Sequence, residues 1–312
     1  MAGQLKIISG TSNPELSRSI VEKLGVELTP VLLDTFSDGE IRVEIQDNVR
    51  GDDVFVIQSL SKPVNFNLMQ TCLILDALKR ASARRVTAVL PYYGYARQDR
   101  KVSPRAPISA KLVADFLCVA GMSRLITIDV HAGQIQGFFN VPVDNLFAAP
   151  VALEYLRGIE GEIVIVSPDA GGVERARAYA KRLNAGLAII DKRRDKPNQA
   201  TAMNVIGDVD KKIAVVVDDM IDTAGTMAAA ADVLRNHGAL DVIACATHPV
   251  LSGPAIERLI ASSFSKILIS DTIPLGDKAA ACDKLQVFSI ADLLAKAIRN
   301  THTESSVSEL FI

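Results

Sequence analysis

The sequence predicts an α/β protein with two similar domains, each a mostly parallel central sheet flanked by helices. Short β-branched runs alternate with longer helical patterns, which is the order expected when parallel strands are joined by helices. The expected strands are apolar on both faces, as strands buried between two helical layers tend to be. The alternation runs through the chain twice, and 312 residues suit two domains or one large one.

The predicted strands are short and separated by longer segments with a helical pattern. They are Lys6–Ser9, Val54–Gln58, Val86–Leu90, Leu125–Ile128, Ile163–Ser167, Leu187–Ile190, Ile213–Val217, Val242–Thr247 and Lys266–Ile269. The clearest predicted helices are Asn67–Ala81, Ser109–Ala120, Gly172–Leu183 and Thr226–His237. Gly238 follows the last of these, where a glycine commonly ends a helix.

The two passes of this pattern meet between Asp144 and Ala149. We therefore predict an N-terminal domain of residues 1–145 and a C-terminal domain of residues 146–299. The polar tail of residues 300–312 either joins the N-terminal domain or is disordered.

The composition excludes several classes of protein. Hydrophobic residues make up 49% of the chain and charged residues 22%, which favours packed cores over disorder. A net charge of −2 provides no basic field for nucleic acid. We find no apolar run that approaches a membrane helix and no signal-peptide pattern at the start. The four scattered cysteines show neither zinc spacing nor a disulfide framework, so we expect a cytoplasmic protein.

The strongest functional signal is the segment Val215–Thr226. A buried strand delivers Asp218 and Asp219 to its carboxyl end, and their oxygens can accept hydrogen bonds from a pair of sugar hydroxyls. The residues that follow, Thr223–Thr226, open a helix and can present N–H groups and hydroxyls to a phosphate. One loop can therefore hold an anion at one end and a polyol at the other.

Other kinds of site are less consistent with this loop. An acidic turn followed by a capped helix would need no ligand, but paired acids directly after an apolar strand favour one. The chain has neither a G-x-x-x-x-G-K-[ST] motif nor a G-x-G-x-x-G motif, which disfavours ordinary ATPase and dinucleotide sites.

This segment resembles the phosphoribosyl-pyrophosphate-binding loop of type I phosphoribosyltransferases and their relatives. Further loops make the chain similar, over nearly its whole length, to the class I ribose-phosphate pyrophosphokinases, which have a phosphoribosyltransferase-like fold. The resemblance implies transfer of the β,γ-pyrophosphoryl group of Mg·ATP to the anomeric hydroxyl of ribose 5-phosphate (EC 2.7.6.1). The products would be phosphoribosyl pyrophosphate and AMP. The implied ribose 5-phosphate site comprises Arg194, Asp218, Asp219, Asp222, Thr223, Ala224, Gly225 and Thr226.

Two further loops resemble the nucleotide loops of that family. In Phe36–Glu40, the phenyl ring can stack on a base, while Asp38 and Glu40 can accept hydrogen bonds. In Pro91–Lys101, Arg97 can bind phosphate oxygens with two N–H groups. The resemblance implies that the first loop reaches ATP bound on a neighbouring subunit. The implied ATP-binding residues are Phe36, Asp38, Gly39, Glu40, Arg97, Gln98, Asp99 and His131.

Two loops at strand ends are candidates for the metal. His131 follows the strand Leu125–Ile128, and Asp169 lies in Ser167–Gly172, whose glycines can wrap a pyrophosphate. The resemblance places both residues at the Mg²⁺ site. Because Mg²⁺ prefers oxygen ligands, Asp169 is the stronger candidate for a direct contact.

The charged run Asp191–Asn198 is by itself typical of a solvated surface segment. In the family this loop closes over ATP, which implies that Lys192 and Arg194 are catalytic and stabilise charge on the reacting phosphates.

The resemblance also implies a homohexamer, activation by inorganic phosphate and inhibition by ADP. The implied regulatory residues are Arg50, Arg105, Ser306, Ser308 and Phe311. Ser103-Pro104 departs from the family pattern of a basic residue followed by serine, and proline cannot donate a backbone N–H. This departure leaves the regulation open.

Two alternatives compete with this interpretation. A plain phosphoribosyltransferase would explain Val215–Thr226 but not the nucleotide loops. A non-catalytic regulatory subunit of such a synthase would be expected to carry altered catalytic residues, whereas His131, Asp169 and Lys192 are present.

Overall fold

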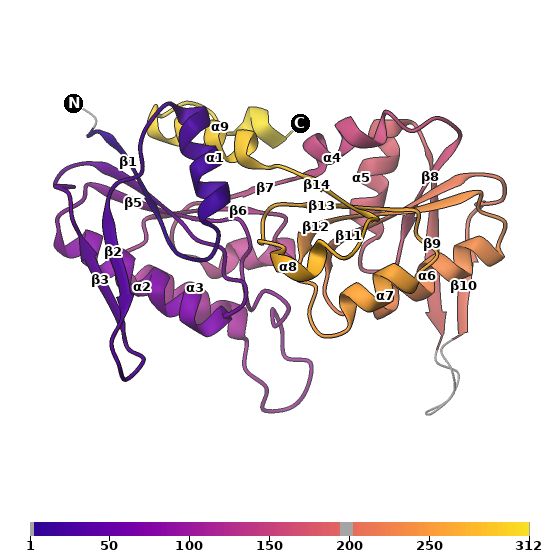
Figure 1. The fold of residues 1–312 in the computed structure, drawn as a ribbon, viewed down its shortest axis with the longest axis horizontal. Helices are drawn as coiled ribbons and strands as arrows, with labels where there is room; N and C mark the ends of the chain where they lie inside the picture. Colours follow the sequence, from indigo (N-terminus) through magenta and orange to yellow (C-terminus); the bar gives the residue numbers. More distant parts are fainter. Residues whose placement is uncertain (1–2, 194–201, 312) are drawn as a thin grey trace. The chain divides into compact units, whose positions relative to one another are not determined.

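The computed structural model of the chain describes residues 3–193 and 202–311, which form two compact units (Figure 1). Unit 1 comprises Met1–Phe147 and Ile290–Ile312, and unit 2 comprises Ala148–Ser289. Each unit has its own mostly parallel sheet with helices on both faces. The predicted fold class is confirmed.

The sheet of unit 1 has the strand order β1-β4-β5-β6-β7, and all neighbouring strands are parallel. Its strands are β1 (Leu5–Ser9), β4 (Asp53–Ile57), β5 (Arg85–Leu90), β6 (Arg124–Ile128) and β7 (Val143–Leu146). An antiparallel hairpin of β2 (Val31–Thr35) and β3 (Ile41–Ile45) stands beside the sheet. Every residue of β4 is buried, as expected for a central parallel strand between two helical layers.

Two helical layers cover the sheet of unit 1 (Figure 1). One layer consists of α2 (Val64–Arg80) and α3 (Ser109–Ala120), and the other of α1 (Pro14–Leu24) and α9 (Ala291–His302). Two 3₁₀ helices, η1 (Gly133–Phe138) and η2 (Ser308–Phe311), complete the unit.

Helix α9 belongs to unit 1, although the sequence prediction assigned residues up to 299 to the second domain. Its apolar face, which includes Leu294 and Ile298, is buried. It packs against α1, where Arg299 Nη2 donates to the carbonyl of Lys23 at 2.9 Å. The last helix therefore completes a layer of the first unit, and the boundary lies after Ser289.

The sheet of unit 2 has the order β10-β9-β8-β11-β12-β13-β14, and only β10 runs antiparallel to its neighbour. Its strands are β8 (Ile163–Ser167), β9 (Gly186–Arg193), β10 (Ala202–Ile206), β11 (Ile213–Ile221), β12 (Asp241–Pro249), β13 (Lys266–Ser270) and β14 (Leu285–Phe288). The helices are α4 (Ala149–Leu156), α5 (Val173–Leu183), α6 (Gly225–Asn236), α7 (Ala255–Ala261) and α8 (Gly276–Ala279). Helices α4 and α5 lie on one face of this sheet, and α6 and α7 lie on the other (Figure 1).

Two expectations from composition can be compared with the structure. The four cysteines carry free thiols, which confirms that they form no disulfide framework. Within residues 3–193 and 202–311, none of the helices combines the length and the apolar character that a membrane crossing requires.

Candidate active site

The topology of unit 2 has a switch point at the carboxyl ends of β8 and β11, which is the place where open parallel sheets form a ligand-binding crevice. Strand β8 lies between β9 and β11, so the chain leaves β8 in one direction through α5 and leaves β11 in the other through α6. The loops that follow β8 and β11 therefore separate, and such a switch point is where open parallel sheets bind ligands. The sequence-predicted loops around Asp169 and Asp218 are these two loops.

Asp218 and Asp219 stand at the carboxyl end of β11 and share one cationic partner. Asp219 is buried, while Asp218 is partly exposed to solvent. The Nη1 atom of Arg175, in the first turn of α5, lies 3.4 Å from Asp218 Oδ1 and 3.6 Å from Asp219 Oδ1. The Asp219 amide also donates to Asp218 Oδ1 at 2.9 Å. The two predicted sugar-binding carboxylates are thus held side by side.

The pKa of Asp218 in this pair is unusually high for a carboxyl group. Burial raises the pKa of Asp218 to about 7, the neighbouring charge of Asp219 adds to this increase, and Arg175 opposes it. The pair therefore presents more negative charge than Arg175 compensates. Groups that donate hydrogen bonds, such as sugar hydroxyls, would stabilise the ionised form.

Helix α6 begins directly after this pair with its N-terminus open. Ala224 has φ +59°, and no side chain caps the first turn, which also lacks an acid. Thr223 and Thr226 are exposed. The helix therefore offers N–H groups, hydroxyls and the positive end of its dipole to an anion. The Asp222 carboxylate accepts a hydrogen bond from the Ser252 hydroxyl.

Asp169 makes hydrogen bonds within the loop that follows β8. Its Oδ1 atom accepts from the amides of Gly171 at 2.9 Å and Gly172 at 3.1 Å, and the Ser167 hydroxyl donates to its carbonyl at 2.6 Å. The side chain is nevertheless exposed. Within the part of the chain that the structure describes, no hydrogen bond is made by Asp169 Oδ2, which leaves an oxygen for a hydrated cation.

The predicted catalytic residues lie at the edge of what the structure describes. Lys192 is in β9, where its backbone pairs with Met203 of β10, but its side chain lies outside the described residues. Arg194 lies outside them altogether. Since β9 is the parallel neighbour of β8, Lys192 lies at the end of a strand whose carboxyl end is on the same edge of the sheet as the Asp169 loop.

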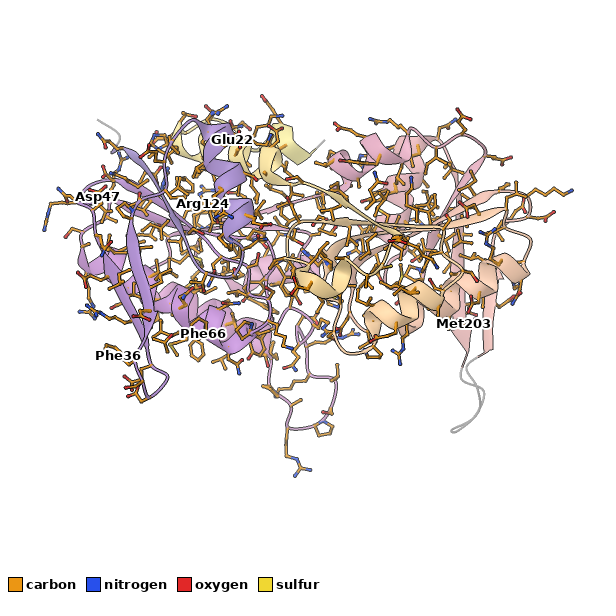
Figure 2. All side chains as sticks on the ribbon, in the orientation of Figure 1. Glu22, Phe36, Asp47, Phe66, Arg124 and Met203 are labelled. Atoms are coloured by element: carbon orange, nitrogen blue, oxygen red, sulfur yellow. The ribbon has the colours of Figure 1, made fainter. Side chains whose placement is uncertain are left out.

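In unit 1, the loop Phe36–Glu40 forms the tip of the β2–β3 hairpin, and Figure 2 shows Phe36 projecting from that tip. The Phe36 amide donates to the Glu40 carbonyl at 2.8 Å, and Asp38 Oδ1 accepts from the Glu40 amide at 3.1 Å. Gly39 has φ +97°, a conformation that few other residues adopt. The turn therefore holds Phe36 with 52% of its surface exposed, which is unusual for phenylalanine.

The other predicted ATP-binding residues of unit 1 are brought together. The loops after the adjacent parallel strands β5 and β6 leave the same edge of the sheet, and Gln134 Nε2 donates to Asp99 Oδ2 at 2.6 Å. Gln98 accepts from the Ser109 hydroxyl at the start of α3. Arg97 and His131 are exposed on these loops. A cation, an imidazole and a carboxylate therefore gather at one edge of the sheet.

Gly94 and Asp129 shape these two loops. A Cβ atom at Gly94 would lie 2.4 Å from the Leu60 carbonyl oxygen, so only glycine fits there. Asp129 has φ +40°, which is strained for a residue with a side chain. Asn145 of β7 supports this turn by accepting from the Val130 amide at 3.0 Å.

The predicted metal ligands His131 and Asp169 belong to different units. Across residues 3–193 and 202–311, no cluster of three or more histidine, cysteine, aspartate or glutamate side chains is arranged to hold a metal ion. Mg²⁺ in nucleotide enzymes commonly uses one or two carboxylates together with substrate phosphates and waters. Asp169 fits such a site because it is an exposed carboxylate in a glycine-rich loop.

The predicted regulatory residues fall into two groups within unit 1. Arg50 precedes β4, at the amino ends of the strands, and the tail is tied to that edge by the contact of His302 Nδ1 with Asp53 Oδ2 at 2.9 Å. The Ser308 amide donates to the Ser306 hydroxyl at 3.1 Å. Arg105 instead follows the carboxyl end of β5. The side chain of Phe311 lies outside the described residues.

Arg175 and Gln134 are the residues of these loops that sequence reasoning missed. Arg175 lies three residues after Gly172, in a helix whose other charged residues are exposed. It is partly buried and contacts Asp218, which the sequence alone does not indicate. Gln134 has an ordinary polar side chain whose contact with Asp99 depends on the neighbouring strand. Neither residue type carries a signal in the sequence alone.

Comparison with known proteins supports the interpretation of these loops. Residues 5–121 match the family described as the N-terminal domain of ribose phosphate pyrophosphokinase. Residues 192–312 match the phosphoribosyl synthetase-associated domain. The second match includes the β11–α6 loop, and the first includes the Phe36 hairpin.

Full-length relatives extend this match over the whole chain. Ribose-phosphate pyrophosphokinases from Caldanaerobacter subterraneus and Aquifex aeolicus are 55% and 54% identical, and each alignment covers 98% of this chain and 98% and 99% of the relative. The crystal structure of phosphoribosylpyrophosphate synthetase from Mycobacterium smegmatis is similar with a TM-score of 0.92 and 42% identity, covering 97% of this chain and 100% of that one. This chain therefore belongs to the ribose-phosphate pyrophosphokinases (EC 2.7.6.1), which make phosphoribosyl pyrophosphate from ATP and ribose 5-phosphate.

Proposed function

We propose that the chain binds ribose 5-phosphate in the crevice of unit 2, with the 5-phosphate at the N-terminus of α6 and the ribose hydroxyls at Asp218 and Asp219. The observation that carries this proposal is the junction of an uncapped, acid-free helix N-terminus with a pair of partly or fully buried carboxylates. An anion site and a hydroxyl-accepting site then lie within nine residues of one another in the sequence, as a sugar phosphate requires.

The nucleotide would be bound by residues of unit 1. Phe36 offers an exposed ring for the base, and Arg97 offers a guanidinium for phosphate oxygens. We propose that Phe36, Asp38 and Glu40 serve a nucleotide on a neighbouring copy, while Arg97, Gln98, Asp99 and His131 serve the copy that carries them. Lys192 and Arg194 would stabilise the negative charge that develops on the phosphates during transfer.

Magnesium would be held by Asp169, with His131 as the weaker candidate. The bound ion would neutralise phosphate charge, which is its usual contribution to phosphoryl-type transfer. The chain itself orients the two substrates, because an attack of the anomeric hydroxyl on the β-phosphorus of ATP requires in-line positioning.

A negative charge introduced at the N-terminus of α6 tests the ribose 5-phosphate site. Thr226→Asp places a carboxylate where the 5-phosphate would bind, and we expect kcat/KM for ribose 5-phosphate to fall by at least about 100-fold. An acid in the first turn favours the helix dipole, so the protein should remain folded. Thr226→Asn is the matched control, because it has the same shape without the charge. AMP formation from Mg·ATP measures both, and equal rates for Asp and Asn would reject the site.

Self-association is supported by one helix face of unit 1. On α3, Leu112, Phe116 and Val119 recur at spacings that place them on one side, and they are 50%, 49% and 78% exposed. Lys111 and Asp115 flank this stripe, so a second copy in antiparallel orientation would meet opposite charges. We propose that two copies of the chain meet here, and that this contact is one of the interfaces of a homohexamer. Phe116→Glu should lower the mass measured by light scattering, whereas Leu240→Glu in unit 2 should not.

Regulation by inorganic phosphate and ADP remains a proposal for Arg50, Arg105 and the tail residues Ser306, Ser308 and Phe311. Because Arg105 and the tail lie at opposite ends of the strands of unit 1, a shared site would draw on more than one copy of the chain. Titrating activity with phosphate, with and without ADP, tests this proposal, and a flat response would reject it. We also propose that the enzyme works in the cytoplasm, where a reducing environment keeps cysteines such as these as free thiols.

A further inference from the structure

The segment that follows β12 makes hydrogen bonds to the residues that lead into the proposed phosphate loop. Strand β12 is the parallel neighbour of β11, so the chain leaves both strands at the same edge. The amides of Leu251 and Ser252 donate to the carbonyls of Ile221 and Asp222, each at 3.0 Å. The Ser252 hydroxyl also donates to the Asp222 carboxylate. These contacts fix the backbone that leads into α6.

Arg258 of α7 is a cation that contacts this loop. Its Nη1 atom donates to the Thr223 carbonyl at 3.0 Å. A Cβ atom at Gly225 would lie 3.2 Å from the same Nη1 atom and 3.8 Å from Cζ. The guanidinium therefore lies against the first residue of α6, on the exposed side of the loop.

The position of Arg258 has two consequences for an anion at α6. The hydrogen bond turns the Thr223 carbonyl toward Arg258, so that this oxygen does not oppose the N–H groups at the helix start. The guanidinium also adds a full positive charge next to the partial charge of the helix terminus. Asp222, the acid in the same loop, accepts a hydrogen bond from the Ser252 hydroxyl.

We infer that Arg258 is a further determinant of ribose 5-phosphate binding, which acts through its charge on the 5-phosphate and through its hold on the Thr223 carbonyl. This inference rests on the proposed position of the phosphate at α6. It assigns no role to Arg258 in the binding of ATP or in the transfer step.

Three substitutions distinguish the effect of the Arg258 charge from the effect of its hydrogen bond to the Thr223 carbonyl. Arg258→Gln keeps a donor for the Thr223 carbonyl but removes the charge, Arg258→Lys keeps the charge, and Arg258→Ala removes both. With saturating Mg·ATP, we expect the KM for ribose 5-phosphate to rise about 10-fold for Gln and more for Ala. Lys should stay within about 3-fold of the wild type. The KM for ATP and the kcat at saturating ribose 5-phosphate should change by less than about 2-fold.

The salt dependence of KM gives a readout that a purely structural role would not affect. Because salt screens exposed charges, the KM of the wild type for ribose 5-phosphate should rise more steeply with ionic strength than that of Arg258→Gln. Arg235→Gln is the matched control, because Arg235 lies in the last turn of α6, paired with Asp241 at 2.8 Å. It should leave the KM and its salt dependence unchanged.

The outcomes distinguish this inference from the proposed function. If Arg258→Gln matches the wild type in KM and salt dependence while Thr226→Asp is impaired, the phosphate site stands and the role of the Arg258 charge is overturned. If neither variant changes the KM for ribose 5-phosphate, the phosphate is not at α6 and both proposals fall. A parallel loss of kcat for every Arg258 variant, including Lys, would also overturn the inference.

Discussion

The Nη1 atom of Arg175 lies 3.4 Å from Asp218 Oδ1 and 3.6 Å from Asp219 Oδ1, so one guanidinium serves two adjacent carboxylates. The pKa of Asp218 is nevertheless raised to about 7, because burial and the charge of Asp219 outweigh the effect of Arg175. A pair that is poorly neutralised in the absence of ligand stores unfavourable energy that a substrate can relieve. Two predictions follow from this balance, one for stability and one for activity.

The first prediction concerns Asp218→Asn in the ligand-free protein. A carboxyl whose pKa is higher in the folded chain contributes stability in full below its unfolded value, near 4, and that contribution is lost as pH rises toward 7. Asparagine stays neutral and can still accept from the Asp219 amide. We therefore expect the variant to be more stable than the wild type at pH 8 by on the order of 2 kcal/mol, with the difference vanishing near pH 4.

Denaturant unfolding at several pH values, without substrates or Mg²⁺, measures this difference. Asp208→Asn is the control, because the side-chain hydrogen bond from Lys212 lowers the pKa of Asp208. The stability from Asp208 is present above its unfolded pKa and is lost as pH falls, so its replacement should bring no gain at pH 8. A gap for Asp218→Asn that does not change with pH would contradict the assignment.

The second prediction concerns Arg175→Gln. The charge of Arg175 lowers the pKa of Asp218, so its removal should raise that pKa further. If ribose binding uses the ionised carboxylate, the acid limb of the profile of kcat/KM for ribose 5-phosphate against pH should move to higher pH. Activity lost at pH 7 should be partly recovered at pH 9. Arg182→Gln, in the last turn of the same helix, should leave the profile in place, and an identical shift there would reject the specific role of Arg175.

The third prediction concerns Lys192, for which the family resemblance implies a catalytic role. Lys192→Ala should lower kcat by at least about 100-fold, the usual scale for one group that stabilises the transition state. The KM for ribose 5-phosphate should change much less. Lys181→Ala, on the outer face of α5, is a control with the same loss of charge in the same unit. A kcat close to that of the wild type would remove Lys192 from the catalytic residues.

The sequence predicted the parts of the fold that carry strong local signals. Buried strands such as β8, with an unbroken apolar run, and helices such as α6, which is followed by Gly238 with φ +89°, were found because periodicity and a glycine stop mark them. The β2–β3 hairpin was missed because its strands are partly exposed and carry charges. Helix α9 was assigned to the wrong unit because its partner α1 lies far away in the sequence.

In the candidate site, too, the residues with a local signal were predicted and the others were missed. Asp218, Thr223 and Thr226 were predicted because one continuous segment contains both the strand end and the helix start. Arg175 and Arg258 were missed because each reaches this segment from another element, through a neighbouring strand and its helix. Residue types predict a site when all its groups lie in one continuous segment. Residues that reach the segment from another strand or helix can be found only once the topology of the sheet is known.

The last prediction concerns Phe36 and the neighbouring copy. Because Phe36 is exposed at a hairpin tip, Phe36→Ala should cost little stability and should weaken ATP binding by about 5- to 100-fold, the scale of base stacking. If Phe36 serves the site of a neighbour, co-expression of Phe36→Ala with Asp218→Ala should yield mixed oligomers in which some sites have both an intact hairpin and an intact unit 2. Activity at low ATP should then exceed that of either variant alone.

Co-expression of a second pair of variants is the control for this complementation. When Asp218→Ala chains are mixed with Asp169→Ala chains, unit 2 is damaged in every subunit, so the mixed oligomers should recover no activity. Differently tagged chains allow the mixed species to be purified before the assay. If the purified mixture of Phe36→Ala and Asp218→Ala chains is no more active than its parents, Phe36 does not act across a subunit boundary, because random assembly would otherwise place an intact hairpin beside an intact unit 2 in some of the mixed oligomers.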